Sequence, residues 1–255
     1  MLILAVDGLD HEIAKRLGHP KMPYERKLTI PKELYHKGRP HSLKIWPSMF
    51  SGRIVDTQVW NSKNEIKYEI RKTMASFLRS IGRKDLIKKA KHDKRLRQST
   101  SWRIRPDNVD IETVFTDRRS LIWNIPTITP ECIMHYPSVD DMLEYAKREQ
   151  MIWEMVVLGM ARTSYELCAA YCHELDSLGH MNVKPEPLYR DLSSFIDLVN
   201  KISMHDTIMV VSDHGMNDGR HTEYAYLGCN KPINAETVMD VRGEIERLLL
   251  EEKNE

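Results

Sequence analysis

Short apolar runs recur along the chain, and the longest of them end at polar residues. They are Leu2–Val6, Tyr165–Tyr171 and Thr207–Val211. Continuous runs of this length are typical of strands that are buried on both faces of a parallel sheet. A fourth candidate strand, Ser120–Trp123, must end before Pro126, because proline cannot continue a strand's hydrogen bonding.

Segments with helical periodicity separate these runs. Apolar residues recur at three- and four-residue spacing in Val139–Met160, Pro185–Ile202 and Ala235–Leu250. Alternation of strands and helices predicts an α/β fold, with a mostly parallel central sheet and helices on both of its faces. In such sheets, ligands bind at the carboxyl ends of the strands.

One stretch, at about residues 53–117, interrupts this alternation. Its centre, Ile70–Arg97, has helical periodicity, and between positions 71 and 105 it carries thirteen Lys and Arg against Asp85 and Asp93. We interpret it as a small, basic, mainly helical cap or lid inserted into a single domain of residues 1–255. Such a surface could attract polyanions, including nucleic acid, or could be only the solvated face of its helices.

The bulk composition changes this picture little. Of the 255 residues, 41% are hydrophobic and 29% are charged, and the formal net charge is +1, which is typical of a soluble globular protein. No stretch approaches the roughly 20 apolar residues that a membrane-spanning helix needs. We therefore expect a cytoplasmic protein without a membrane partner.

The polar residues that follow the predicted strands form a candidate metal site. It has three aspartates and three histidines: Asp7, Asp176, His180, Asp213, His214 and His221. Any one of them alone would be read as an ordinary turn residue, but all six fall at the same predicted edge of the sheet. Carboxylate and imidazole ligands in this number suit two divalent metal ions, with zinc or manganese favoured.

A nucleophile is also available in the segment from Ser42 to Gly52. This segment offers hydroxyl groups at Ser42, Ser48 and Ser51. A metal-bound hydroxyl group of this kind has a lowered pKa and can attack phosphorus directly, so it needs no separate general base. The residues alone leave open which serine would act.

Taken together, these motifs resemble the type I phosphodiesterase and nucleotide pyrophosphatase branch of the alkaline phosphatase superfamily. The resemblance rests on the segment AVDGLD, which contains Asp7, and on the motifs D-x-x-G-H and D-H-G, which begin at Asp176 and Asp213. It also rests on the last histidine, His221, and on the block from Ser42 to Gly52. It implies an alkaline phosphatase-like fold and makes Ser42 the nucleophile, with Ser48 as the alternative.

The resemblance also implies how the ligands are shared. One ion would be bound by Asp7, Ser42, Asp213 and His214, and the other by Asp176, His180 and His221. The expected activity is hydrolysis of a phosphoric ester, a nucleotide above all, through a phosphoserine intermediate. Two alternatives stay open: a phosphomonoesterase or phosphonate hydrolase of the same superfamily, and a catalytically silent nucleic-acid-binding protein that uses the basic insert.

Overall fold

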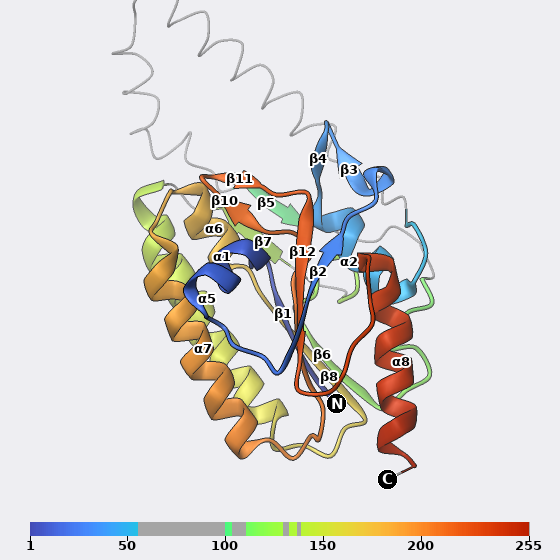
Figure 1. The fold of residues 1–255 in the computed structure, drawn as a ribbon. Helices are drawn as coiled ribbons and strands as arrows, with labels where there is room; N and C mark the ends of the chain where they lie inside the picture. Colours follow the sequence, from blue (N-terminus) through green and yellow to red (C-terminus); the bar gives the residue numbers. More distant parts are fainter. Residues whose placement is uncertain (56–99, 104–110, 130–132, 137–138, 255) are drawn as a thin grey trace, which may run out of the picture.

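A computed structural model describes residues 1–55, 100–103, 111–129, 133–136 and 139–254. The predicted helical centre of the insert, residues 70–97, lies outside these ranges. The central feature is a six-stranded sheet in the order β2-β12-β9-β1-β8-β6 (Figure 1). Its strands are β2 (Tyr24–Thr29), β12 (Tyr224–Cys229), β9 (Ile208–Val211), β1 (Leu2–Val6), β8 (Leu167–Cys172) and β6 (Ser120–Trp123).

The sheet is mixed but mostly parallel, as expected. Strand β1 lies in the middle and pairs in parallel with β8 and β9, and β6 pairs in parallel with β8. Strand β12 is antiparallel to both β9 and β2, so within the described residues it alone runs against the other five strands. The carboxyl ends of β1, β8 and β9 therefore meet at one edge of the sheet.

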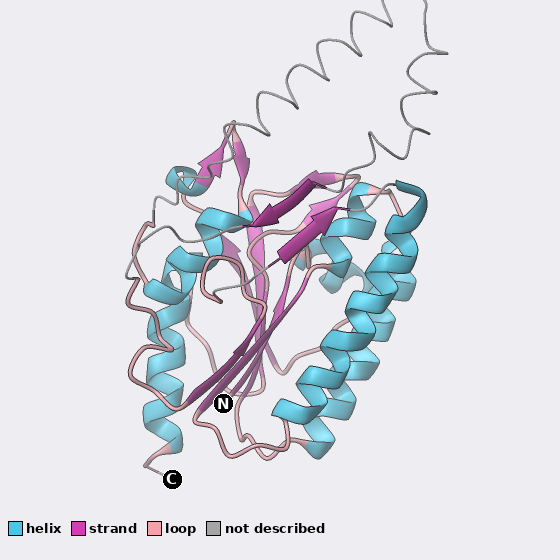
Figure 2. Cartoon of the chain, turned by 180° about the vertical axis from the view of Figure 1, so that it is seen from behind, coloured by secondary structure: helices cyan, strands magenta, loops and turns pink. Residues whose placement is uncertain are grey.

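Helices cover both faces of this sheet (Figures 1 and 2). On one face, α2 (Ser42–Ser51) and α8 (Val241–Glu252) pack in the core that contains Ile3 and Ala5. On the other face, α1 (His11–Leu17), α5 (Val139–Met160) and α7 (Pro185–Ile202) pack in the core that contains Leu2, Leu4 and Val6. Alternate residues of β1 thus point into two separate cores, which is why the strand is apolar throughout.

Several predicted bounds need correction. The strand predicted over Tyr165–Tyr171 is β8, Leu167–Cys172, and the helix predicted over Ala235–Leu250 begins only at Val241. It is preceded by the short 3-10 helix η2 (Val238–Asp240), which is fixed by a capping box between Thr237 and Asp240. The short helix α6 (Glu174–His180) lies just after β8, where the sequence predicted ligands but no helix.

Small elements gather at the carboxyl ends of the parallel strands (Figure 1). They are the pairs β3 (Tyr35–His36) with β4 (Arg39–Pro40), β10 (Met216–Asn217) with β11 (Arg220–His221), and β5 (Thr100–Arg103) with β7 (Ile133–Tyr136); the short helix η1 (Lys32–Leu34) precedes β3.

Within the described ranges, no helix combines the length and the apolar character that crossing a lipid bilayer requires.

Candidate metal centre

The carboxyl ends of three neighbouring strands bring the predicted ligands together. Asp7 directly follows β1, and Asp213 and His214 follow β9. Asp176 and His180 are contributed by α6, which begins just after β8, and His221 ends β11. These segments lie far apart in the sequence but at one edge of the sheet, where the α/β topology places binding sites.

Asp176, His180 and His221 form one potential metal-binding group, with ligand atoms that all lie within 4.8 Å of one another. The Oδ1 atom of Asp176 is 3.5 Å from His180 Nε2 and 3.3 Å from His221 Nε2. Asp176 and His180 are one helical turn apart on α6, so their side chains share a face. The His180 side chain is 42% exposed, so this group faces solvent.

A second potential metal-binding group consists of Asp7, Asp176 and His214, all of them buried. His214 Nε2 lies 3.3 Å from Asp7 Oδ1 and 3.4 Å from Asp213 Oδ2. It is also 3.3 Å from the hydroxyl oxygen of Ser42. Asp176 therefore belongs to both groups, and His214 joins Asp7, Asp213 and the candidate nucleophile.

Buried His214 and partly buried His221 are each oriented by the ring nitrogen that points away from the cluster. The Nδ1 atom of His214 is 3.1 Å from the carbonyl oxygen of Gly215, and that of His221 is 3.1 Å from the carbonyl oxygen of Pro40. Because a carbonyl can only accept, each Nδ1 carries the hydrogen and donates it, which leaves Nε2 to face the cluster. Metal-binding histidines in proteins are commonly held in this way.

Burial dominates the electrostatics of the carboxylates. Burial, and then the nearby charges of Asp213 and Asp176, raise the pKa of Asp7 to about 7. Burial likewise raises the pKa of Asp213 to about 6. For Asp176, burial is outweighed by hydrogen bonds from His173 and His221, which hold the pKa of its carboxyl well below the usual range.

The pKa values of the histidines depend on the same balance between burial and hydrogen bonding. Burial lowers the pKa of His214. Burial also opposes the charged form of His221, but its hydrogen bond to Asp176 prevails and raises its pKa to about 9. The same balance raises the pKa of His173 to about 9. In the metal-free protein, protons therefore occupy positions where a cation would be favourable.

Several buried oxygens of this cluster have no hydrogen-bond partner among the described residues. They are Oδ1 of Asp7 and both carboxylate oxygens of Asp213. A buried, unpaired carboxylate oxygen is costly unless a cation or donor compensates it. The oxygen and imidazole donors, and the unpaired oxygens among them, fit a divalent metal ion.

The two candidate nucleophiles occupy different surroundings. Ser42 is the first residue of α2, is only partly buried, and its hydroxyl faces His214. Ser48 is fully buried in the same helix, and its hydroxyl oxygen accepts a hydrogen bond of 2.8 Å from the backbone N–H of Val55. Ser42, not Ser48, thus lies in contact with a member of the cluster.

Glycines allow the close approach of the segments that carry the ligands. Gly8 has a φ of +77°, and a Cβ atom there would lie 2.7 Å from the backbone nitrogen of Asp176. At Gly179, a Cβ atom would collide with the side chain of Met216. The chain therefore turns sharply at Gly8, whereas Gly179 provides space for a neighbouring side chain.

Sequence reasoning missed two residues that touch the cluster. The hydroxyl of Tyr171 donates a hydrogen bond of 2.5 Å to Asp7 Oδ2, and His173 Nε2 lies 3.2 Å from Asp176 Oδ2. Tyr171 lies near the end of β8, and His173 directly follows the strand. Their place just before the predicted ligands is visible in the sequence, but it does not indicate which aspartate each would contact.

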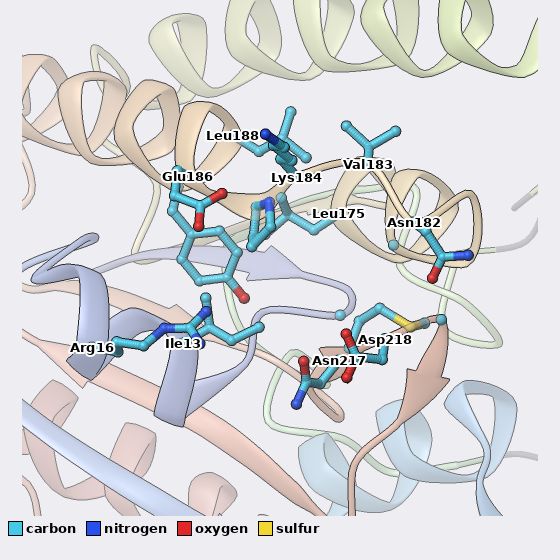
Figure 3. Close-up of a pocket in the computed structure, with 16 residues that line it drawn as sticks. Ile13, Arg16, Leu175, Asn182, Val183, Lys184, Glu186, Leu188, Asn217 and Asp218 are labelled. Atoms are coloured by element: carbon cyan, nitrogen blue, oxygen red, sulfur yellow. The ribbon is translucent and has the colours of Figure 1, made fainter.

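A cavity of about 500 Å³ lies beside the cluster, between α1 and the segment that joins α6 to α7 (Figure 3). Its lining includes Gly8, Leu175 and Gly179, which are chain neighbours of the ligands and not the ligands themselves. Arg16 and Lys184 are among its polar lining residues (Figure 3). The cavity therefore adjoins the backbone that carries the cluster, while the partly exposed His180 marks the cluster's solvent side.

Comparison with protein-family profiles and with curated protein sequences found no match for this chain.

Proposed function

We propose that this protein is a metal-dependent phosphoric ester hydrolase of the phosphodiesterase/nucleotide pyrophosphatase type, with an alkaline phosphatase-like fold and a phosphoserine intermediate. The observation that carries the proposal is the meeting of the six predicted ligands beside the hydroxyl of Ser42. Unpaired oxygens of two buried aspartates, Asp7 and Asp213, at the same place support a metal-dependent chemistry over a purely structural cluster.

The proposed metal ligands follow the resemblance described above. Asp7, Ser42, Asp213 and His214 would hold one divalent ion, zinc or manganese, and Asp176, His180 and His221 would hold the other. Such ions lower the pKa of a bound hydroxyl or water and offset the negative charge of a phosphoryl group. Asp176 is assigned to the second ion, but it also lies close to Asp7 and His214 of the first, so the two ions would be close together.

The chain itself positions the nucleophile. Ser42 begins α2, a helix of 10 residues, so a phosphoryl group next to its hydroxyl would lie at the positive end of the helix dipole. His214 Nε2, which carries no hydrogen when Nδ1 donates to Gly215, can accept the hydroxyl proton of Ser42 across 3.3 Å in the metal-free protein. The hydroxyl oxygen is thereby turned toward the cluster.

In the first proposed step, Ser42 Oγ gives up its proton and forms a bond to phosphorus as the bond to the leaving alcohol breaks, and the leaving oxygen takes up one proton from solvent in exchange. In the second step, water attacks the phosphoserine and restores the Ser42 hydroxyl.

Substrate would approach from the side of His180, the most exposed ligand. A nucleotide is the proposed substrate class, and the protein is proposed to act in the cytoplasm.

The deciding experiment measures hydrolysis of aryl phosphodiester, phosphomonoester and sulfate ester substrates by purified protein with manganese or zinc. We expect turnover of the phosphodiester, and a loss on the order of 1,000-fold or more in Ser42→Ala, because the nucleophile is removed. Ser48→Ala is the matched control in the same helix. It should retain turnover and lose only about 1 kcal/mol of stability with its hydrogen bond to Val55 N–H.

Each other outcome points elsewhere. Loss of turnover in Ser48→Ala but not in Ser42→Ala would reverse the assignment of the nucleophile. Preference for the phosphomonoester would move the protein to a different branch of the superfamily. If no ester is hydrolysed with either metal, and the protein binds nucleic acid in a salt-sensitive manner, the hydrolase proposal is wrong and a binding function replaces it.

A further inference from the structure

We propose that Tyr171 and His173 are positioning residues that aim the carboxylates of Asp7 and Asp176 into the metal centre. This inference rests on the metal centre of the proposed function and extends it to two residues that the sequence did not indicate. Each holds the outer oxygen, Oδ2, of one aspartate. In both aspartates, the inner oxygen, Oδ1, then faces the imidazole groups of the cluster.

The position of Tyr171 follows from strand pairing. Tyr171 is paired with Ala5 in the parallel register of β1 and β8, and the backbone N–H of Asp7 donates to the carbonyl oxygen of Cys172 at 2.8 Å. Its hydroxyl thereby reaches Asp7 Oδ2 at 2.5 Å. Its ring is fully buried and packs edge-on against Trp46, at 5.5 Å between centroids. Because Trp46 belongs to α2, the same ring connects Asp7 to the helix of the nucleophile.

His173 contacts Asp176 with one ring nitrogen and Ser177 with the other. It is 2% exposed and precedes α6, three positions before Asp176. Its Nε2 atom is 3.2 Å from Asp176 Oδ2, and its Nδ1 atom is 2.9 Å from the hydroxyl of Ser177. With both ring nitrogens engaged, the imidazole has a fixed orientation, and so has the carboxylate that it contacts.

The two contacts have the same consequence. Asp7 Oδ1 is buried and without a hydrogen bond among the described residues, and Asp176 Oδ1 faces the imidazole groups of His180 and His221, whereas Oδ2 of each aspartate is held by Tyr171 or His173. A carboxylate that is free to rotate could turn either oxygen toward a donor. Holding Oδ2 removes that freedom, so Oδ1 remains available as a ligand.

The test has two measurements. Binding of Co²⁺, added as the sole metal, is followed by its visible ligand-field absorption, which depends on the coordination geometry. Binding of Mn²⁺ and of Zn²⁺ is measured by calorimetric titration. Tyr171→Phe removes one hydroxyl and keeps the ring, and His173→Leu removes both ring nitrogens. We expect each to weaken metal binding by ten- to hundredfold and to change the Co²⁺ spectrum. His173→Gln, whose amide can still donate to Asp176, should recover most of the affinity.

Matched controls remove comparable buried contacts elsewhere. Tyr226→Phe deletes a hydroxyl that donates to Glu25 at 3.1 Å, and His205→Leu deletes an imidazole whose Nε2 is 3.1 Å from the carbonyl oxygen of Met160. Both should lower stability without changing the metal affinity or the Co²⁺ spectrum. A purely structural role for Tyr171 and His173 would give the same result as these controls.

The possible failures are distinguishable. If Tyr171→Phe and His173→Leu bind Co²⁺ with the affinity and spectrum of the wild type, the positioning inference is overturned, while ester hydrolysis by the wild type still supports the proposed function. If the wild type binds none of the three metals, both the metal centre and this inference fail. Should His173→Leu not fold, Tyr171→Phe and His173→Gln decide the question, because each keeps a residue of similar size.

Discussion

Asp213 and Asp10 are both fully buried aspartates, but their surroundings differ. Asp10 accepts hydrogen bonds from the N–H of Ile13 at 2.9 Å and from the hydroxyls of Thr222 and Tyr224 at 3.2 and 3.3 Å. Neither oxygen of Asp213 has a hydrogen-bond partner among the described residues. The carboxylate of Asp10 is thus stabilised by the fold, whereas that of Asp213 is left for a ligand.

We therefore predict opposite effects of Asp213→Asn on stability and on metal binding. Burial raises the pKa of Asp213 to about 6, so above pH 6 its ionised form destabilises the folded state. At pH 8, the metal-free variant should be more stable than the wild type by about 1 to 3 kcal/mol. Its affinity for Mn²⁺ should nevertheless fall. Urea unfolding in EDTA and calorimetric titration measure the two effects.

Asp10→Asn is the control for this pair of measurements. Asn keeps only one acceptor oxygen where Asp10 has several donors around it, so this variant should lose stability. A gain of stability in Asp10→Asn, or a loss in Asp213→Asn, would contradict the distinction drawn between the two carboxylates.

At the scale of elements, the end of β1 and the start of α6 meet in a close backbone contact. The left-handed conformation of Gly8 lets the chain leave β1 directly beneath the backbone of Asp176. We predict that Gly8→Ala loses about 1 to 3 kcal/mol of stability and also loses metal affinity, because the added methyl group displaces the start of α6. Urea unfolding and Co²⁺ titration test the two parts.

Gly18 offers the matched control. It ends α1 with a φ of +65°, but a Cβ atom there would have nothing within 4 Å. Gly18→Ala should cost only the backbone term, about 1 kcal/mol, and leave metal binding unchanged. Equal metal affinity in Gly8→Ala and Gly18→Ala would mean that the contact with Asp176 does not position the ligand.

The sequence predicted parallel strands and the two longest helices better than the antiparallel part of the sheet. Leu2–Val6, Ser120–Trp123, Val139–Met160 and Pro185–Ile202 have the bounds that their apolar periodicity indicated. Strand β2 was missed, because it lies at the sheet edge with a single fully buried residue, Leu28, and so carries no apolar run. Without β2 and β12, the antiparallel part of the sheet could not be predicted.

The candidate site was predictable where it depended on strand ends. Asp7, Asp213 and His214 follow apolar strands in the sequence, so the topology alone places them together. The support from Tyr171 and His173 was not predictable, because it depends on the register between β1 and β8 and on the start of α6. The expected roles of the basic insert concern residues that lie largely outside the described ranges.

At the scale of the whole molecule, four buried or partly buried titratable groups make the folding stability fall as the pH rises above 7. Burial raises the pKa of Asp7 to about 7 and that of Glu174 to about 8. Against the effect of burial, hydrogen bonds to Asp176 raise the pKa of His173 and His221 to about 9. The folded protein keeps these four protons at a pH where the unfolded chain has lost them, so each favours folding below its folded pKa.

We predict that the metal-free protein loses thermal stability as the pH rises from 7 to 9, when these protons leave. Divalent metal should stabilise it more at pH 8.5 than at pH 6.5, because the cation replaces protons on Asp7 and His221. Thermal unfolding with EDTA or with Mn²⁺ across this range measures both effects. A melting temperature that is independent of pH in EDTA, or an equal shift by Mn²⁺ at both values, would contradict this prediction.

The central place of β1 also has a consequence for synthesis on the ribosome. Residues 2–6 leave the ribosome before the segments that flank them, because residues 167–172 and 208–211 follow about 165 and about 206 residues later. At cellular translation speeds these delays are roughly 10 to 40 s. Until then a wholly apolar segment lacks one or both of its lateral partners, so nascent chains should depend on chaperones until the β9 segment has emerged.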